Sequence, residues 1–262
     1  MNYKKCLSYK AFIKSPFKSI KHSTYFDVYD ELFSKYRNKR ITFIEVGVLS
    51  GGSLFMWRNF FGTKARIIGI DLNPKAKKWT KHGFEIFIGN QSDPIFWKNL
   101  KSKIGQVDII LDDGGHKYID QITTIEFMLE KIKNNGMIVV EDTHTSYIDD
   151  FGDKNYSFIN YIKKKIDKIN YRSHRINKKD PETKIWSLRV FESIVAIEVK
   201  NKMKLTKSFP IKNQGIDDKA KDFRVEQSKI SKNNYLINRI INKFNILRSE
   251  KKANFVIKKY FK

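Results

Sequence analysis

Two short acidic segments contain the residues of this 262-residue chain that are best suited to catalysis. Each follows an apolar run typical of a buried strand, and each contains a histidine. They are Asp112-Asp113-Gly114-Gly115-His116 and Glu141-Asp142-Thr143-His144. Neighbouring carboxylates repel one another, and burying them together is costly unless a cation neutralises them. Because oxygen ligands favour magnesium, calcium or manganese, the segments predict a divalent-cation site; solvated acids that cap helices are the alternative.

A glycine-containing loop, residues 47–53, lies where the first predicted strand passes into a helix. Glycines let backbone amides approach a ligand closely, and a helix N-terminus adds further donors. Asp71 ends the next predicted strand, where doubly wound folds place an acid that binds ribose hydroxyls. Leu49 stands where the dinucleotide fingerprint has its second glycine, and no Gly-Lys-Ser/Thr of a P-loop is present. The loop therefore favours a nucleoside ligand, and a tight strand–helix turn is the alternative.

Glu45 precedes the first glycine of the loop by two residues. An acid there is unfavourable near a pyrophosphate but suits a positively charged ligand such as S-adenosylmethionine (SAM). The loop resembles motif I of the class I SAM-dependent methyltransferases. This resemblance implies that the loop lies beneath the methionine part of SAM, that Asp71 holds the ribose, and that Gln91 and Ser92 contact adenine. The implied SAM-binding residues are Glu45, Gly47, Ser50, Gly51, Ser53, Asp71, Leu72, Gln91, Ser92, Asp112 and Tyr25.

The two acidic segments together resemble the metal-dependent sugar O-methyltransferases of the macrocin and mycinamicin type. The resemblance implies that magnesium is bound by Asp113, Glu141 and Asp142. It also implies that His116 is the general base, in keeping with the ability of imidazole to take up a proton near neutral pH. Asp113 would then serve both metal binding and catalysis. His144 is an alternative base, or a residue that orients the substrate.

The resemblance extends over residues 21–147 and returns at residues 190–199, so it covers about half of the chain. His22 and Tyr25 lie in a segment that resembles one helping to close the site in the family. Gly115 stands where the family often has serine, and this departure affects the turn that presents His116.

The elements that must position these residues alternate between strand and helix. Apolar, β-branched runs predict buried strands at Ile41–Val46, Arg66–Ile70, Val107–Leu111 and Met137–Val140, with a weaker one at Glu85–Ile88. Helices are expected at Ser23–Tyr36, Ser53–Phe61, Pro94–Lys103 and Tyr118–Lys133, the last stopped by Gly136, and one or two late strands at Ser187–Val199. With the resemblance, this order predicts an α/β fold: a doubly wound, mostly parallel, seven-stranded Rossmann-like sheet.

Three parts of the chain are expected from its composition together with the resemblance. They are an N-terminal helical segment at 1–38, a SAM-binding methyltransferase domain at 39–200 and a basic helical C-terminal extension at 201–262, with amphipathic helices at 228–262. Lys and Arg total 52 against 28 Asp and Glu, a net charge of +24 that favours anionic partners. Lysines that merely solvate the surface are the alternative. The extension could form a homo-oligomer contact or a lid, lie on an anionic membrane, or hold nucleic acid.

The function predicted from these features is SAM- and magnesium-dependent methylation of a sugar hydroxyl, on a nucleotide sugar or a surface-polysaccharide or other glycan precursor. Nucleic acid ranks below sugar as the acceptor, because base methylation does not call for the acidic metal site. An RNA methyltransferase and a non-catalytic SAM-fold binding protein are the alternatives. One cysteine, and no run of 18 apolar residues, suggest a reducing, cytoplasmic location.

Overall fold

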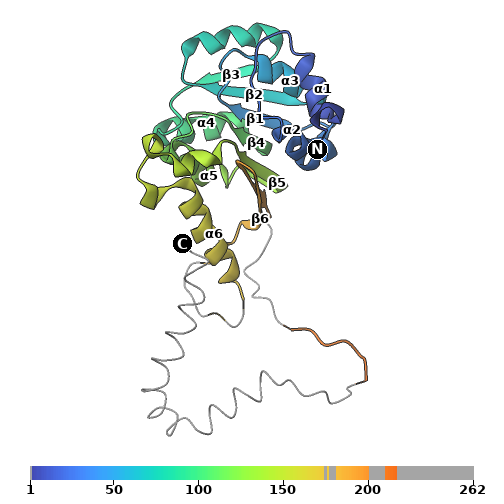
Figure 1. The fold of residues 1–262 in the computed structure, drawn as a ribbon, viewed down its shortest axis with the longest axis vertical. Helices are drawn as coiled ribbons and strands as arrows, with labels where there is room; N and C mark the ends of the chain where they lie inside the picture. Colours follow the sequence, from blue (N-terminus) through green and yellow to red (C-terminus); the bar gives the residue numbers. More distant parts are fainter. Residues whose placement is uncertain (1, 174–175, 177–180, 201–209, 217–262) are drawn as a thin grey trace. The chain divides into compact units, whose positions relative to one another are not determined.

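The computed structural model describes residues 2–173, 176, 181–200 and 210–216 (Figure 1). The chain divides into two compact units, Met1–Phe209 and Pro210–Lys262. Within the described ranges, no helix is both long and apolar enough to cross a membrane. The basic helices expected at 228–262 lie outside the described residues, so the role of the extension stays a prediction.

The first unit is built on a seven-stranded sheet with the order β3-β2-β1-β4-β5-β7-β6. The strands are β1 Thr42–Val46, β2 Arg66–Asp71, β3 Glu85–Ile88, β4 Val107–Asp112, β5 Ile132–Val140, β6 Ile185–Phe191 and β7 Ile194–Val199. The first five pair in parallel, whereas β7 runs antiparallel to both β5 and β6. The strand order reverses between β1 and β4, which is where open α/β sheets bind ligands. The predicted doubly wound, mostly parallel sheet is confirmed.

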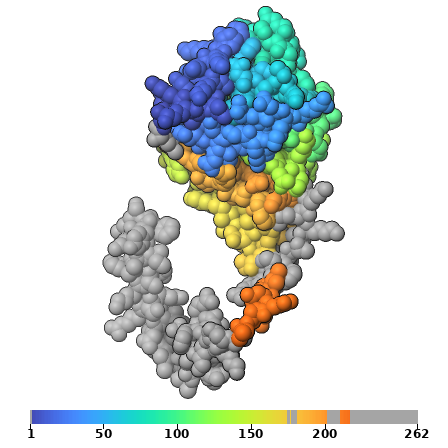
Figure 2. All heavy atoms as spheres, turned by 90° about the vertical axis from the view of Figure 1, so that its right-hand side faces the viewer, coloured from blue at the N-terminus to red at the C-terminus, as the bar shows by residue number. Residues whose placement is uncertain are grey.

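Helices cover both faces of this sheet. They are α1 Leu7–Ile13, α2 Tyr25–Phe33, α3 Gly52–Phe61, α4 Pro94–Ile104, α5 Tyr118–Met128 and α6 Phe158–Asn170. Consecutive strand residues point to opposite faces, so Phe43 packs with Trp57 of α3 on one face, and Ile44 packs with Trp97 of α4 on the other. Helix α1 lies against α2 and α3. Figure 2 shows the N-terminal residues, in dark blue, on the surface of the first unit.

Short 3-10 turns complete the described part of the chain. They are Tyr3–Lys5, Ser34–Tyr36, Pro74–His82, Thr143–Tyr147, Asp149–Phe151 and Lys154–Tyr156. The helix predicted at Ser23–Tyr36 is α2 followed by the second of these turns.

Two predicted boundaries are wrong. The helix expected to run from Tyr118 to Lys133 ends at Met128, and the strand expected at Met137–Val140 begins at Ile132, as β5. Ile132 is fully buried and pairs with Val107 of β4, so burial in the sheet overrides the helical spacing of the apolar residues. Gly136, the expected stop signal, therefore lies inside a strand.

Candidate active site

A pocket of about 490 Å³ opens at the carboxyl ends of β1, β2, β4 and β5, and residues 18–22 line it from the N-terminal side. Its size is ordinary for a cavity that holds a small ligand. The residues predicted to bind SAM that line it are Gly47, Ser50, Ser53, Asp71, Leu72, Gln91 and Tyr25. Four of the predicted catalytic and metal residues also line it: Asp113, His116, Glu141 and Asp142. The structure thus brings most of the two predicted sites into one cavity.

The glycine loop is held in place by Asp71. One carboxylate oxygen of Asp71 accepts hydrogen bonds of 2.9 Å from the amides of both Val48 and Leu49. Gly47 has φ +90°, and a Cβ there would lie 2.0 Å from the carbonyl oxygen of Asp113. Glycine is therefore required for close approach of the loop to the acidic segment after β4. Asp71 fixes the loop at the same time as it faces the pocket.

Glu45 lies beneath the loop rather than in the pocket wall. Its carboxylate accepts hydrogen bonds from the Ser53 hydroxyl at 2.8 Å and the Trp57 indole at 2.9 Å. Burial raises the pKa of Glu45 to about 7, against the lowering effect of Lys21. Ser53 lines the pocket, whereas Glu45 and Trp57 do not, so Glu45 acts on that wall by holding Ser53.

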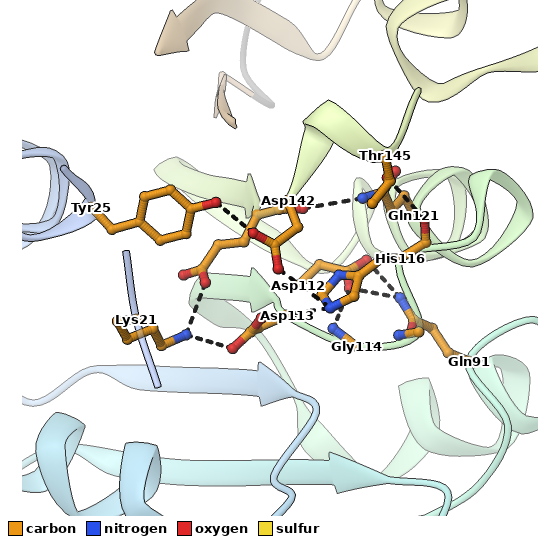
Figure 3. Close-up of polar contacts among 12 residues, drawn as sticks. Lys21, Tyr25, Gln91, Asp112, Asp113, Gly114, His116, Gln121, Asp142 and Thr145 are labelled. Atoms are coloured by element: carbon orange, nitrogen blue, oxygen red, sulfur yellow. Dashed lines mark hydrogen bonds and ion pairs between the residues drawn. The ribbon is translucent and has the colours of Figure 1, made fainter. Parts of the chain in front are cut away.

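Asp112 and Gln91 support the turn that carries His116 (Figure 3). The Gln91 amide donates hydrogen bonds of 2.7 Å to both oxygens of Asp112, and its carbonyl accepts one of 3.0 Å from the Gly115 amide. Burial raises the pKa of Asp112 to about 6, although the bonds from Thr124 and Gln91 oppose that rise. Asp112 is buried behind the pocket wall, whereas its neighbour Asp113 faces the pocket.

A buried lysine joins the acidic side chains, as Figure 3 shows. The Nζ atom of Lys21 lies 2.5 Å from Oδ2 of Asp113 and 2.8 Å from Oε2 of Glu141. Burial by itself lowers the pKa of Lys21, but the two carboxylates outweigh burial and hold this pKa well above its ordinary value. The side chain is therefore charged. The other oxygen of Glu141 accepts a 2.6 Å hydrogen bond from the Tyr29 hydroxyl, and Tyr25 donates one of 2.5 Å to Asp142.

His116 faces the same group of acids. Its Nε2 lies 3.4 Å from Oδ2 of Asp142 and 4.0 Å from Oδ1 of Asp113. Nδ1 is buried and has no hydrogen-bond partner among the described residues. The residue has φ +55°, uncommon for a side chain with a Cβ, and its carbonyl accepts a hydrogen bond from the Thr145 hydroxyl. This strained turn directs the imidazole toward Asp113 and Asp142.

The donor set fits a hard divalent cation. Asp113, His116 and Asp142 each offer one ligand atom, and these three atoms lie within 4.8 Å of one another. The two carboxylates supply the oxygen ligands that magnesium and manganese prefer, whereas imidazole is a more usual ligand for zinc, copper, iron and nickel. Glu141, the third predicted ligand, lines the same pocket, but its two oxygens accept hydrogen bonds from Lys21 and Tyr29.

The remaining predicted residues lie outside the pocket lining. His144 is exposed, its Nδ1 is 3.0 Å from the Ser193 hydroxyl, and its ring lies 6.2 Å from that of His22. The hydroxyl of Ser92 donates to Asn90. Gly51 lies against Trp79, where a Cβ would be 2.3 Å from the indole. Lys21 and Tyr29 were not predicted to have a role, since Lys21 is one lysine in a lysine-rich chain and Tyr29 lies on the apolar face of α2.

The comparisons with known proteins agree with this geometry. Residues 44–143 match a family model described as a methyltransferase domain. The chain is similar to the 8-demethyl-8-alpha-L-rhamnosyl tetracenomycin-C 2'-O-methyltransferase of Streptomyces olivaceus, with 28% identity over 58% of this chain and 42% of that protein. It is also similar to the mycinamicin VI 2''-O-methyltransferase of Micromonospora griseorubida, with 33% identity over 47% of this chain and 32% of that protein.

Among solved structures, the chain is similar to the MycE methyltransferase from the mycinamycin biosynthetic pathway, in complex with Mg and SAH. That match has 26% identity and a TM-score of 0.65, and it covers 74% of this chain and 53% of the other. The chain thus spans about half, or less, of the length of these relatives.

The sheet order and the pocket at its switch point, together with the matched methyltransferase domain and the likeness to MycE, are those of a class I SAM-dependent methyltransferase fold. Within that class, the chain is related to the macrocin- and mycinamicin-type sugar O-methyltransferases.

Proposed function

We propose that this protein is a SAM- and magnesium-dependent O-methyltransferase that acts on a sugar hydroxyl. The observation that carries the proposal is the meeting of the glycine loop with Asp113, His116 and Asp142 in one pocket. A methyl donor and an activated acceptor must lie side by side for direct transfer, because the catalytic advantage of such a site comes from orientation.

The acidic group would hold the cation and the acceptor. Asp113 and Asp142 are the proposed ligands, with Glu141 as the third ligand that the family resemblance implies, and His116 is kept for proton transfer. A bound divalent cation would lower the pKa of the acceptor hydroxyl and fix its oxygen. The chain's own contribution is to gather these acids at adjacent strand ends and to hold them with hydrogen bonds from Tyr25 and Tyr29.

His116 is the proposed general base. As the acceptor oxygen takes the methyl group of SAM, the oxygen–hydrogen bond breaks and the proton goes to Nε2 of His116, leaving SAH and the methyl ether. The carboxylate of Asp142, 3.4 Å from this atom, stabilises the imidazolium that forms. The hydrogen bond from Thr145 to the His116 carbonyl keeps the strained turn in position.

The activities for which the relatives are named support a sugar as the acceptor. They name methylation of a rhamnosyl 2'-oxygen, of mycinamicin VI at 2'' and of demethylmacrocin. The net charge of +24 further favours an acceptor with phosphate groups, such as a nucleotide sugar or a lipid-linked glycan. A cytoplasmic role in surface-polysaccharide synthesis belongs to the same proposal, as do peripheral association with an anionic membrane and a homo-oligomeric state.

One observation favours a second candidate, an RNA methyltransferase. The chain is 36% identical to the ribosomal RNA large subunit methyltransferase E of Methanoregula boonei over 37% of this chain and 54% of that protein. The basic composition also suits a phosphate backbone. This candidate ranks second because it leaves the acidic group and His116 without a role.

A screen of acceptors distinguishes the two. The full chain is incubated with SAM and magnesium in the presence of a panel of nucleotide sugars or of ribosomal RNA, and SAH is measured. We expect SAH with at least one nucleotide sugar and none above background with RNA. SAH formed only with RNA would replace the sugar proposal, and SAM binding without SAH in either panel would favour a non-catalytic binding protein.

A further inference from the structure

Residues 15–24, here called the strap, cross the pocket between two anchored ends. At the first end, the Ser15 hydroxyl donates a 2.8 Å hydrogen bond to the Gly52 carbonyl, and the Phe17 ring lies 4.5 Å from that of Trp79. At the other end the strap leads into α2 at Tyr25. Residues 18–22 between these ends all line the pocket. The strap is therefore part of the wall that faces the acidic group.

Lys21 fastens the middle of the strap to the acids. Its Nζ lies 2.5 Å from Asp113 and 2.8 Å from Glu141, and its side chain is only 2% exposed. Among the lysines and arginines that the structure describes, Lys21 is the one that forms ion pairs with Asp113 and Glu141. A buried ammonium needs such partners, because it has lost its hydration shell.

The same oxygens are needed by a divalent cation. Asp113 is shared between Lys21 and the three-residue group that could hold a metal, and Glu141 has its Oε2 on Lys21. Two cations on one carboxylate repel each other strongly inside a protein, where solvent screens charge poorly. A metal that is bound here must either displace the ammonium or tolerate this repulsion.

We propose that Lys21 is a positioning residue that competes with the divalent cation for Asp113 and Glu141, and so sets the affinity of the acidic group for metal. In the metal-free protein the ammonium neutralises and orders the two carboxylates. On metal binding the ammonium releases Asp113 and Glu141, and the middle of the strap loosens. This inference rests on the proposed function, because it takes the acidic group to be the metal site.

Manganese binding tests the inference directly, since Mn²⁺ can be followed by electron paramagnetic resonance without any turnover. The variants are Lys21→Met, which removes the charge, Lys21→Arg, which keeps it, and Lys18→Met as a matched control. Lys18 lies in the same strap and also lines the pocket, but it is exposed. We expect Lys21→Met to bind Mn²⁺ about tenfold tighter or more, with Lys21→Arg and Lys18→Met within about twofold of the wild type.

Equal or weaker Mn²⁺ binding by Lys21→Met would overturn the inference while leaving the proposed function intact. Absence of Mn²⁺ binding in all four proteins would overturn both. Mn²⁺ binding with the expected order but no methyl transfer to any acceptor would remove the proposed function alone.

A measurement on the wild-type protein covers the case in which Lys21→Met fails to fold. Amide hydrogen exchange of residues 18–22 is compared with and without Mn²⁺, in the absence of SAM. We expect faster exchange with the metal, because the strap loses its central contact. Unchanged or slower exchange would contradict displacement of Lys21.

Discussion

The hydroxyl of Tyr29 donates a 2.6 Å hydrogen bond to Oε1 of Glu141 across 112 positions of sequence. Both side chains are buried, and the bond joins the middle of α2 to the carboxyl end of β5. The N-terminal segment is thus a structural part of the acidic site. Helix α2 supplies Tyr25 and Tyr29 to two of its carboxylates, and the strap supplies Lys21 to a third.

Substitution of Tyr29 by phenylalanine should destabilise the protein. Phenylalanine keeps the ring contacts with Phe33 and Trp57 but leaves an oxygen of a buried carboxylate without its donor. We expect a loss of about 1–3 kcal/mol in the free energy of unfolding, measured by urea titration. Tyr36→Phe is the control, since its hydroxyl bond to Asn135 is exposed. Equal effects of the two variants would show that burial of the Tyr29–Glu141 bond is not important.

Stability should fall with rising pH because of Glu45. Burial raises its pKa to about 7 from an unfolded value of 4.5, so the folded state binds the proton more tightly. The cost of ionising buried Glu45 is absent below its unfolded pKa of 4.5 and is complete above its folded pKa of about 7. We expect a loss on the order of 3 kcal/mol between about pH 4.5 and 7.

Glu45→Gln should reduce this pH dependence and leave the part that comes from Asp112, whose pKa burial raises to about 6. Glutamine can still accept the hydrogen bond from Trp57 and can donate one to Ser53, so the packing is retained. The measurement is urea unfolding across pH 4.5–7. Glu192→Gln, at an exposed glutamate, controls for the loss of one negative charge. The same slope in Glu45→Gln and wild type would mean that Glu45 is not its source.

Loss of the His116 imidazole should separate turnover from SAM binding. We expect His116→Ala to lower kcat by about 10²–10⁴-fold, with SAM affinity within a few-fold of the wild type by calorimetry. His144→Ala, tested in parallel, should cost less, because His144 is outside the pocket lining and is directed to Ser193. The opposite order would assign the base to His144.

Substitution of Asp113 by asparagine should weaken metal binding. The change removes the negative charge shared by Lys21 and the possible metal group, while keeping the size of the side chain. We expect at least a tenfold or so increase in the Mn²⁺ dissociation constant, with little change in SAM affinity. Asp149→Asn, at an exposed acid, is the control. Unchanged Mn²⁺ binding in Asp113→Asn would exclude this residue as a ligand.

Much of the fold could be predicted because the parallel strands read as continuous apolar runs. The acids after β4 and β5 were expected to meet, since carboxyl ends of neighbouring parallel strands share one edge of the sheet. The sequence predicted less well which acids face the pocket. Asp112 is buried behind the pocket wall, whereas Asp113 is part of that wall. Adjacent residues point to opposite sides, so a one-residue difference changes the role.

Lys21 could not be found from the sequence because its partners are 92 and 120 positions away. No local pattern separates it from the other lysines, and its role depends on the tertiary path of the strap. Helix α6 was not predicted because its many lysines hide a narrow apolar face, of which Phe158 and Ile162 are buried. The end of α5 was misplaced because Ile132 fits both a helical stripe and a buried strand.

Metal dependence of methyl transfer is the most direct test of the central claim. The full chain, freed of metal with EDTA, is assayed for SAH with SAM and an acceptor nucleotide sugar, before and after magnesium is restored. The account predicts that turnover disappears on chelation, returns with magnesium, and stays absent in Asp113→Asn at the same metal concentration. Full turnover in EDTA would contradict it.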